Sequence, residues 1–261
     1  MTRIAAVMAA SAFLTAGCAP AQSEGPAVAP RLVWSAPLAE DFDALPRVAD
    51  DTPEAREINA YLDRIDVSDR AERADCLAGG RDNVEWGRTV KAPMTGPRFV
   101  SVLLSTGYYC GGAHPSWGQK SLTFDLESGR LVDWAGFLPD DMALPRYQAG
   151  DQWPQLLRSS SLKARYAREA IAQRRMPEGE DECAEVLMDS EPLDVWPDAR
   201  TGGLALQVSG LAHAVSACTE TVVMPLAELR QRGVDPALID ALETAHRTGQ
   251  WRPLPPEDPR D

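Results

Sequence analysis

The sequence predicts a single α+β domain in which helices pack on a mostly antiparallel sheet. Three observations predict it. Segments with clear helix-capping signals stand near both ends of the chain, and strand-like apolar segments joined by short turns stand between them. The length of 261 residues is also sufficient for one domain with a large buried core. We therefore assign residues 33–250 to one folded domain.

The first predicted helix begins at Asp51 or Thr52, since either side chain is suited to cap a helix. Pro53 follows in the first turn, and Glu54 is placed to complete a capping box with Asp51. Apolar residues then recur at helical spacing, at Ile58, Leu62 and Ile65.

Strands are predicted in the middle of the chain. Residues 99–110 are mostly apolar and rich in residues that favour strands. Apolar and polar residues alternate in the next segment, where the apolar positions are Leu122, Phe124 and Leu126. Residues 127–129, Glu-Ser-Gly, turn the chain into a further apolar pair at 131–132, which predicts a hairpin.

The second half of the chain repeats this mixture of helices and strands. Residues 153–175 predict a helix, with apolar positions set among lysines and arginines. Residues 193–196 and 204–208 predict two strands joined by the turn-forming loop 197–203, and residues 221–224 predict a third strand.

The last predicted helix is capped by Asp235 and has Pro236 in its first turn. Four residues fall along one side of it: Leu238, Ile239, Leu242 and His246. The tail that follows, residues 251–261, is rich in proline and charge and is predicted to be disordered.

The beginning of the chain is typical of a bacterial lipoprotein signal. Arg3 precedes an apolar run at 4–14, and small residues lead to Cys18. Roughly 20 apolar residues are needed to span a bilayer, so the run is too short to be a membrane helix. We expect residues 1–17 to be a signal peptide, Cys18 to be lipidated, and residues 18–32 to be a flexible tether. An ordinary secretory signal is the alternative.

A lipid on Cys18 places the protein in the periplasm, and Ala19 after it favours the outer membrane by analogy with enteric lipoproteins. In that oxidising compartment the four other cysteines predict two disulfides. They are Cys76, Cys110, Cys183 and Cys218. Three pairings exist, and we favour 76 with 110 and 183 with 218 because each pair flanks one continuous segment. A four-thiolate zinc site is the alternative, but no Cys-x-x-Cys pair is present.

The chain is acidic, with a formal net charge of −13. This charge favours solubility and argues against nucleic acid and anionic lipid surfaces as direct partners. A basic partner is compatible with it.

Motifs that carry catalytic chemistry are absent from the sequence. The three histidines, His114, His213 and His246, have no metal-ligand spacing. Neither a Gly-x-Ser-x-Gly elbow nor a Gly-x-x-x-x-Gly-Lys phosphate loop occurs. We therefore assign no catalytic residue, no metal and no cofactor, and we expect His213 and His246 to be structural or solvated.

One constellation of residues stands out. It runs through Gly107-Tyr108-Tyr109-Cys110-Gly111-Gly112-Ala113-His114-Pro115, with Trp117 just beyond. The chain here resembles a bacterial envelope domain of unknown function, and the residues that carry the resemblance are Tyr109, 111–115, 124–126, 128–129, 222–226 and 228–229. That domain forms the extracytoplasmic part of the anti-sigma-V factor RsiV, and a related domain accompanies the peptidoglycan deacetylase PdaC. The resemblance implies an α+β fold and, as in RsiV, recognition of lysozyme, which is a basic protein.

The Gly-Gly-Ala-His-Pro motif allows two interpretations. In the structural one, Gly111 and Gly112 supply positive φ for a tight turn, Pro115 sets the exit, and His114 bonds backbone groups. In the functional one, an aromatic recognition surface is formed by Tyr108, Tyr109, His114 and Trp117.

We therefore expect a lipid-anchored periplasmic binding or accessory module of the cell envelope. Its partner would be a protein such as a lysozyme-like enzyme, or peptidoglycan. The alternatives are a cell-wall hydrolase with His114 as general acid or base, and a purely structural lipoprotein.

Overall fold

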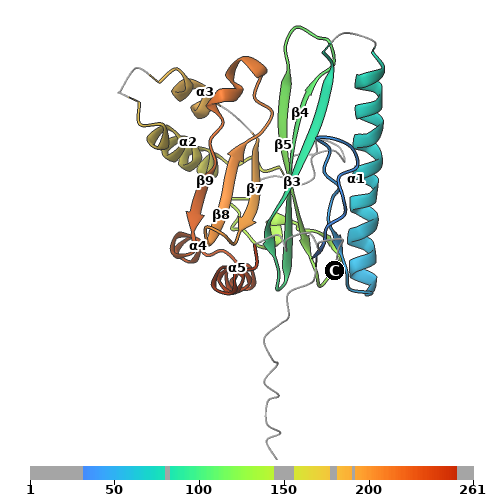
Figure 1. Ribbon diagram of the computed structural model, residues 1–261. Helices are drawn as coiled ribbons and strands as arrows, with labels where there is room; N and C mark the ends of the chain where they lie inside the picture. The colour runs from blue at the N-terminus through green and yellow to red at the C-terminus, as the bar shows by residue number, and fades with distance from the viewer. Residues whose placement is uncertain (1–31, 80–82, 144–155, 177–180, 190–191, 252–261) are drawn as a thin grey trace, which may run out of the picture.

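The computed structural model describes residues 32–79, 83–143, 156–176, 181–189 and 192–251. The two larger antiparallel sheets of the described residues lie side by side, and helices cover their outer sides (Figure 1). The predicted α+β class and single domain are confirmed. The signal peptide, Cys18 and the tail from 252 onward lie outside the described residues. None of the helices in the described residues combines the length and the apolar composition that a membrane span requires.

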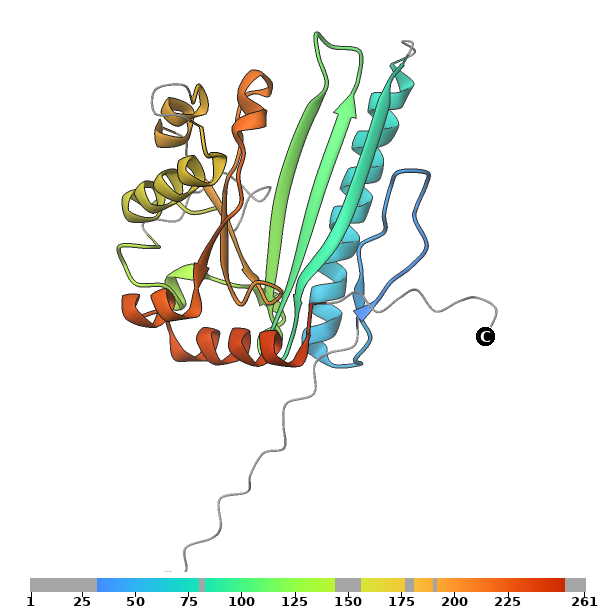
Figure 2. The same cartoon turned by 60° about the vertical axis from the view of Figure 1, so that its left-hand side comes forward.

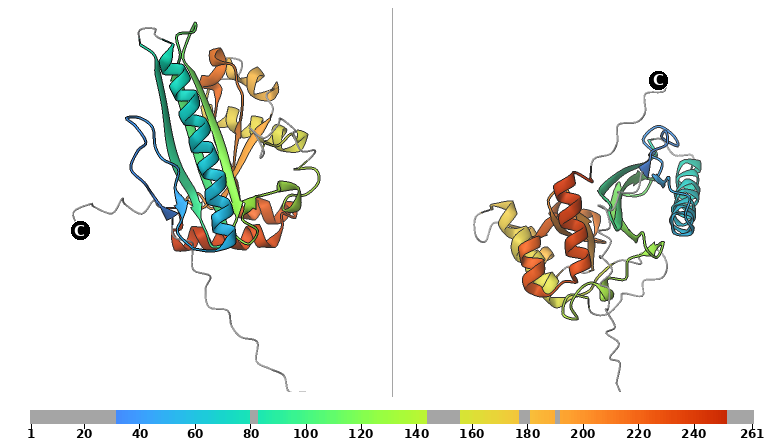
Figure 3. Two further views of the ribbon diagram at one scale, coloured as in Figure 1. Left: turned by 90° about the vertical axis from the view of Figure 1, so that its right-hand side faces the viewer. Right: turned by 90° about the horizontal axis from the view of Figure 1, so that it is seen from below.

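The first sheet has the strand order β3-β4-β5-β6. Its strands are β3 (Glu85–Thr95), β4 (Phe99–Tyr109), β5 (Ser116–Asp125) and β6 (Arg130–Leu131). Helix α1 (Pro53–Ala78) runs along one face of this sheet (Figure 3). Beside them, β1 (Leu32–Val33) pairs with β2 (Arg47–Val48), so Leu32 belongs to the fold and not to the tether.

Apolar residues of α1 and of the sheet form one of the two main cores. Ile58 and Leu62 of α1 are buried together with Val102, Leu122 and Phe124 of the sheet. The alternation of Leu122 and Phe124 therefore marks the strand face that meets the helix, as the sequence predicts.

The capping of α1 differs in one detail from the prediction. Thr52 is the cap, and its hydroxyl oxygen accepts a hydrogen bond from the Ala55 amide at 3.1 Å. Asp51 pairs with Arg56 instead, so the expected capping box with Glu54 does not form. The reason is the position of the cap, because a capping box needs its acidic residue three positions after it.

The second sheet has the order β7-β8-β9. Its strands are β7 (Leu193–Asp198), β8 (Gly203–Val208) and β9 (Val222–Pro225). Around it lie α2 (Ser160–Arg174), α3 (Cys183–Asp189), α4 (Leu226–Arg232) and α5 (Pro236–Thr248), and the 3-10 helices η1 (Trp134–Gly136) and η3 (His213–Cys218). Helix α5 runs along the lower end of the molecule (Figure 2). Its predicted Asp235 cap is confirmed by a bond from the Ala237 amide.

The helix predicted over 153–175 is shorter than expected. It begins at Ser160, after the Ser159 hydroxyl accepts a hydrogen bond from the Leu162 amide at 3.2 Å. Leu157 instead forms a β-bridge with Leu193, which keeps this segment extended. Residues 153–155 lie outside the described residues. At the other end of the domain, Trp251 packs against the core of the second half, although the sequence assigns it to the tail.

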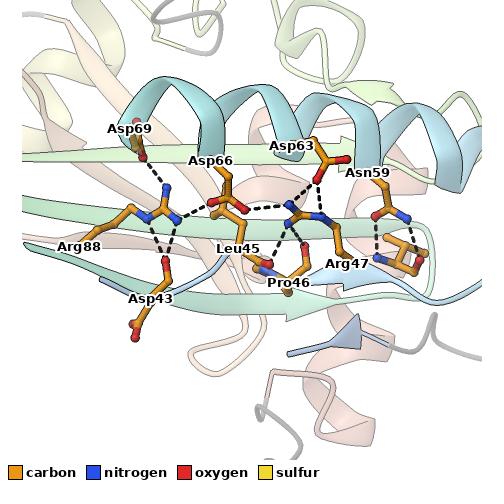
Figure 4. A network of polar contacts seen from close by, with 10 residues as sticks. Asp43, Leu45, Pro46, Arg47, Asn59, Asp63, Asp66, Asp69 and Arg88 are labelled. Atoms are coloured by element: carbon orange, nitrogen blue, oxygen red, sulfur yellow. Dashed lines mark hydrogen bonds and ion pairs between the residues drawn. The ribbon is translucent and has the colours of Figure 1, made fainter. Parts of the chain in front are cut away.

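Strand β3 was missed by the sequence analysis because it looks polar. Its Arg88 is only 1% exposed and is held by carboxylates of α1 (Figure 4). Helix α3 was missed as well, being only seven residues long. The two disulfides join Cys76 to Cys110 and Cys183 to Cys218, which is the favoured pairing.

Candidate functional site: a cleft beside strand β5

A cleft of about 460 Å³ lies beside the N-terminal half of β5. Strand β5 supplies Trp117, Gly118, Gln119 and Lys120 to its lining, and β4 supplies Tyr108. One wall is formed by α1, and the facing wall by the end of β8 and the segment leading into η3. We call this hollow the β5 cleft.

The walls of the β5 cleft come from both halves of the fold. From α1 they include Ile65, Ser68, Asp69 and Glu72. From the second half they include Asp194, Gln207, Ser209, Leu211 and Ser216. The cleft is therefore a product of tertiary packing, in a position where ligands commonly bind.

Two of the predicted recognition residues flank the edge of β5. Tyr108 and Trp117 are 41% and 46% exposed, so both rings are available to a ligand. In the β4–β5 register Tyr108 pairs with Ser116, and Gly107 pairs with Trp117. Because side chains alternate along a strand, Tyr108 and Trp117 project from opposite faces of the sheet. An aromatic ring thus borders the cleft on each side.

Burial shifts the pKa of two charged groups of the cleft, Lys120 and Asp194. Burial lowers the pKa of the Lys120 ammonium, while the carboxylates of Asp69, Glu72 and Asp194 act in the opposite direction. Burial raises the pKa of Asp194 to about 6, against the effect of the hydrogen bonds from Ser121. Those bonds come from the Ser121 amide at 2.9 Å and from its hydroxyl, so Asp194 fixes β5 to β7.

A row of carboxylates runs along α1 toward the cleft, with one acidic residue at every third position. The row consists of Asp63, Asp66, Asp69, Glu72 and Asp75. Arg47 bonds Asp63 and Asp66, and Arg88 bonds Asp66 and Asp69 (Figure 4). These two arginines balance the first three carboxylates and attach α1 to the sheet. Glu72, next in the row, lines the β5 cleft and accepts a hydrogen bond from Ser68.

The other two predicted recognition residues lie outside the lining of the cleft. The Tyr109 hydroxyl donates to the Gly112 carbonyl at 3.1 Å. The His114 ring stacks on His213 of η3, with centroids 4.1 Å apart and planes 10° apart. This stack joins the tip of the β4–β5 hairpin to η3. It was missed by the sequence analysis because no local pattern relates two histidines so distant in sequence.

The Gly-Gly-Ala-His-Pro motif matches its structural interpretation at one glycine and departs from it at the other. Gly111 has a φ of 80°, which favours glycine, whereas Gly112 does not have positive φ. The His114 Nδ1 lies 3.1 Å from the Pro115 carbonyl oxygen, so the ring engages the local backbone.

The geometry gives little support to a hydrolase based on His114. Within the described residues, no carboxylate is hydrogen-bonded to the His114 ring. The same part of the chain contains no cluster of three or more His, Cys, Asp or Glu suited to a metal ion. His246 is exposed, and its Nδ1 lies 2.7 Å from the Ala199 carbonyl oxygen, which is a structural contact.

A second hollow, of about 780 Å³, lies beside β3 and is more open than the β5 cleft. It is bordered by the segment 37–43 and by Gly87, Gly107 and Trp117 of the sheet. Trp117 therefore borders both hollows. The β5 cleft is the better candidate site because it is more enclosed and combines aromatic, amide and charged groups.

Comparison with known proteins gives similarity to solved structures alone, since no family model and no curated protein matches the chain. A DUF3298 family protein from Pseudomonas aeruginosa PAO1 is 15% identical with a TM-score of 0.49, covering 74% of this chain and 84% of that chain. A member of the same family from Bacteroides fragilis NCTC 9343 is 12% identical with a TM-score of 0.42, covering 76% and 75%.

Proposed function

We propose that the protein is a lipid-anchored periplasmic binding module of the RsiV-like type, and that its partner binds in the β5 cleft. One observation carries the proposal: the fold gathers Tyr108 and Trp117, from the motif that the sequence singles out, into one cleft with charged residues. Exposed aromatic side chains at the border of a cleft are typical of recognition sites.

A basic envelope protein, such as a lysozyme-like enzyme, is the partner class that the charge favours. Among the described lining residues, Glu72 and Asp194 stand against the one cation Lys120, while Asp69 already pairs with Arg88 outside the lining. The whole chain carries a net charge of −13, which attracts a basic protein over a distance. Peptidoglycan, which offers no comparable excess of positive charge, is the less favoured partner.

Titration calorimetry with a basic lysozyme tests this function. The mature chain, residues 19–261, is titrated at physiological salt, where unspecific attraction is partly screened. We expect saturable binding that Trp117→Ala weakens by about tenfold or more, as for an aromatic residue at the centre of an interface. Val67→Ala is the control, since Val67 is an exposed apolar residue of α1 that does not line the cleft.

Two results would remove the proposal. One is the absence of binding heat at physiological salt. The other is binding that Trp117→Ala and Val67→Ala leave equally unchanged while both variants keep the melting temperature of the wild type.

The location is proposed on separate grounds. The segment before Cys18 predicts lipidation, and the two disulfides support an oxidising compartment. In cell fractionation, we expect the wild type in the membrane fraction and Cys18→Ser in the soluble periplasmic fraction. Finding both in the same fraction would contradict the lipid anchor.

A further inference from the structure

Among the described strands, the N-terminal half of β5 has a pairing partner on one side alone, which makes it an open edge of the first sheet. On one side, β4 pairs with β5 from Ser116 to Asp125. On the other side, β6 pairs only with Phe124 and Asp125. Unpaired sheet edges are templates for an added strand, and proteins usually cover or shorten them. Here the open stretch lies along the β5 cleft.

The backbone groups that face the cleft follow from the hydrogen bonds lower in the strand. The Ser121 amide donates away from β4, to Asp194, and the Thr123 carbonyl accepts from Val132, also away from β4. Because the direction alternates with a period of two, the N–H and C=O groups of Trp117 and Gln119 also point away from β4. Among the described residues, these groups have no hydrogen-bond partner.

The Gln119 side chain adds an independent observation. It lines the cleft, and its Nε2 is buried without an acceptor among the residues that the structure describes. A buried amide donor normally has a partner, since leaving one unpaired destabilises the folded state. A ligand carbonyl in the cleft would supply the missing acceptor.

The walls of the cleft suit an added strand with basic side chains. An extended peptide presents alternate side chains to opposite sides. On the α1 side they would meet Glu72 and Tyr108, and on the other side Trp117 and the β8–η3 wall. A lysine or arginine at every second position would meet carboxylate oxygens and aromatic faces, both of which attract cations.

We propose that the partner engages the β5 cleft through an extended basic peptide segment, which adds as a strand to the open edge of β5. This inference rests on the proposed binding function and specifies its mode. The backbone groups of Trp117 and Gln119 supply the ladder hydrogen bonds, as in other cases of strand addition. The side chains of Glu72, Tyr108 and Trp117 supply selectivity for basic residues.

The first test uses a labelled ten-residue peptide of alternating lysine and threonine, measured by fluorescence anisotropy with the unmodified domain. We expect it to bind, and its glutamate–threonine counterpart not to bind. Two methylated forms then probe the backbone, one N-methylated at every lysine and one at every threonine. Since successive amides of a strand point in opposite directions, one form should lose binding and the other keep it.

The second test removes a single edge donor from the protein. In Gln119→Pro the lost N–H points away from β4, and proline is tolerated on edge strands in that orientation. We expect this variant to keep its melting temperature and its circular dichroism, and to bind the lysine–threonine peptide about tenfold more weakly. Gln119→Ala keeps the N–H, so we expect a loss of about threefold from the side-chain amide alone.

The results separate this inference from the proposed function. Suppose that Trp117→Ala weakens the binding of lysozyme and that Gln119→Pro leaves it unchanged. This result would overturn strand addition but would still support the proposed binding function. Equal effects of the two methylated peptides would overturn strand addition as well, even if Gln119→Pro failed to fold. Chitotetraose that displaces the peptide and binds more tightly would replace it with glycan recognition.

Discussion

The two halves of β5 have opposite environments. From Ser121 to Asp125 the strand has β6 or Asp194 on its outer side, and Leu122 and Phe124 are at most 1% exposed. From Ser116 to Lys120 the same strand pairs with β4 alone among the described strands, and Trp117 is 46% exposed. The half from Ser121 to Asp125 stabilises the fold, and the half from Ser116 to Lys120 leaves an edge to which a partner can bind.

The comparison shows how a short change in sequence creates a site. Leu122 and Phe124 are large apolar residues that fill the core against α1. The preceding part of the strand lacks such apolar residues. It consists of Gly118, which has no side chain, Gln119, which carries an amide, and Lys120, which carries a positive charge. The apolar half supplies the driving force of folding, so the polar half is free to serve recognition.

The largest expected effect is a difference between two aromatic substitutions on this strand. Phe124→Ala should lower the free energy of unfolding by about 3–5 kcal/mol, because it leaves a cavity in the core beneath Tyr61. Trp117→Ala should lower it by less than about 1 kcal/mol, because the ring is half exposed. Urea unfolding of both variants measures the difference, and equal losses would show that the open half is structural.

The next effect concerns the disulfide beside the turn between β4 and β5, next to the open half of β5. Cys76–Cys110 joins the end of α1 to the residue after β4. Replacing both cysteines by serine should lower the free energy of unfolding by roughly 2–4 kcal/mol. Hydrogen exchange measured by mass spectrometry should then increase over residues 105–120 and stay unchanged over β7 and β8. A uniform increase over the whole chain would contradict this local effect.

The third effect is a pH dependence of stability, caused by Asp194, which bonds the Ser121 end of β5. The pKa of Asp194 is raised from 3.8 to about 6 in the folded protein, so the folded state holds this proton more tightly than the unfolded state. Protonated Asp194 therefore adds about 3 kcal/mol to the free energy of unfolding. This contribution is fully present below pH about 4 and is lost as the pH rises through 6. Asp194→Asn should remove this decline.

The difference between wild type and Asp194→Asn isolates this group from the other carboxylates that titrate in the same window. Urea unfolding at several values between pH 4 and pH 7 gives the two curves. Parallel curves would show that Asp194 is not the group responsible.

The smallest expected effect is at the tip of the hairpin. His114→Ala removes one ring of the stack with His213 but leaves the disulfides and both cores intact. We expect a loss of less than about 1 kcal/mol in the free energy of unfolding, because the His114 side chain is exposed. Faster hydrogen exchange over residues 110–116 should accompany it. A variant that fails to fold would instead favour a structural role for the motif.

Local signals account for the parts of the fold that the sequence predicts. The caps Thr52 and Asp235 each stand before a proline, and the alternation of Leu122 and Phe124 marks a strand. Strand β3 has no such signal, because its Arg88 is stabilised by Asp66 and Asp69 of α1 and by the backbone carbonyl of Asp43, all distant in the sequence. A buried arginine becomes favourable through partners distant in the chain, which no local pattern reveals.

The candidate site follows the same rule. Tyr108 and Trp117 were predictable as a cluster of aromatic residues beside a glycine-rich turn. The walls that turn this cluster into a cleft come from α1 and from the segment between β8 and η3. The His114–His213 stack likewise needs both halves of the fold in place.

Amide exchange along β5, resolved residue by residue by NMR, tests the central claim most directly. In the free protein, the amides of Trp117 and Gln119 should exchange quickly, while those of Gly118, Lys120 and Ser121 are protected. Adding the lysine–threonine peptide should then protect the amides of Trp117 and Gln119. Equal protection of all five amides in the free protein would contradict an open edge at the β5 cleft.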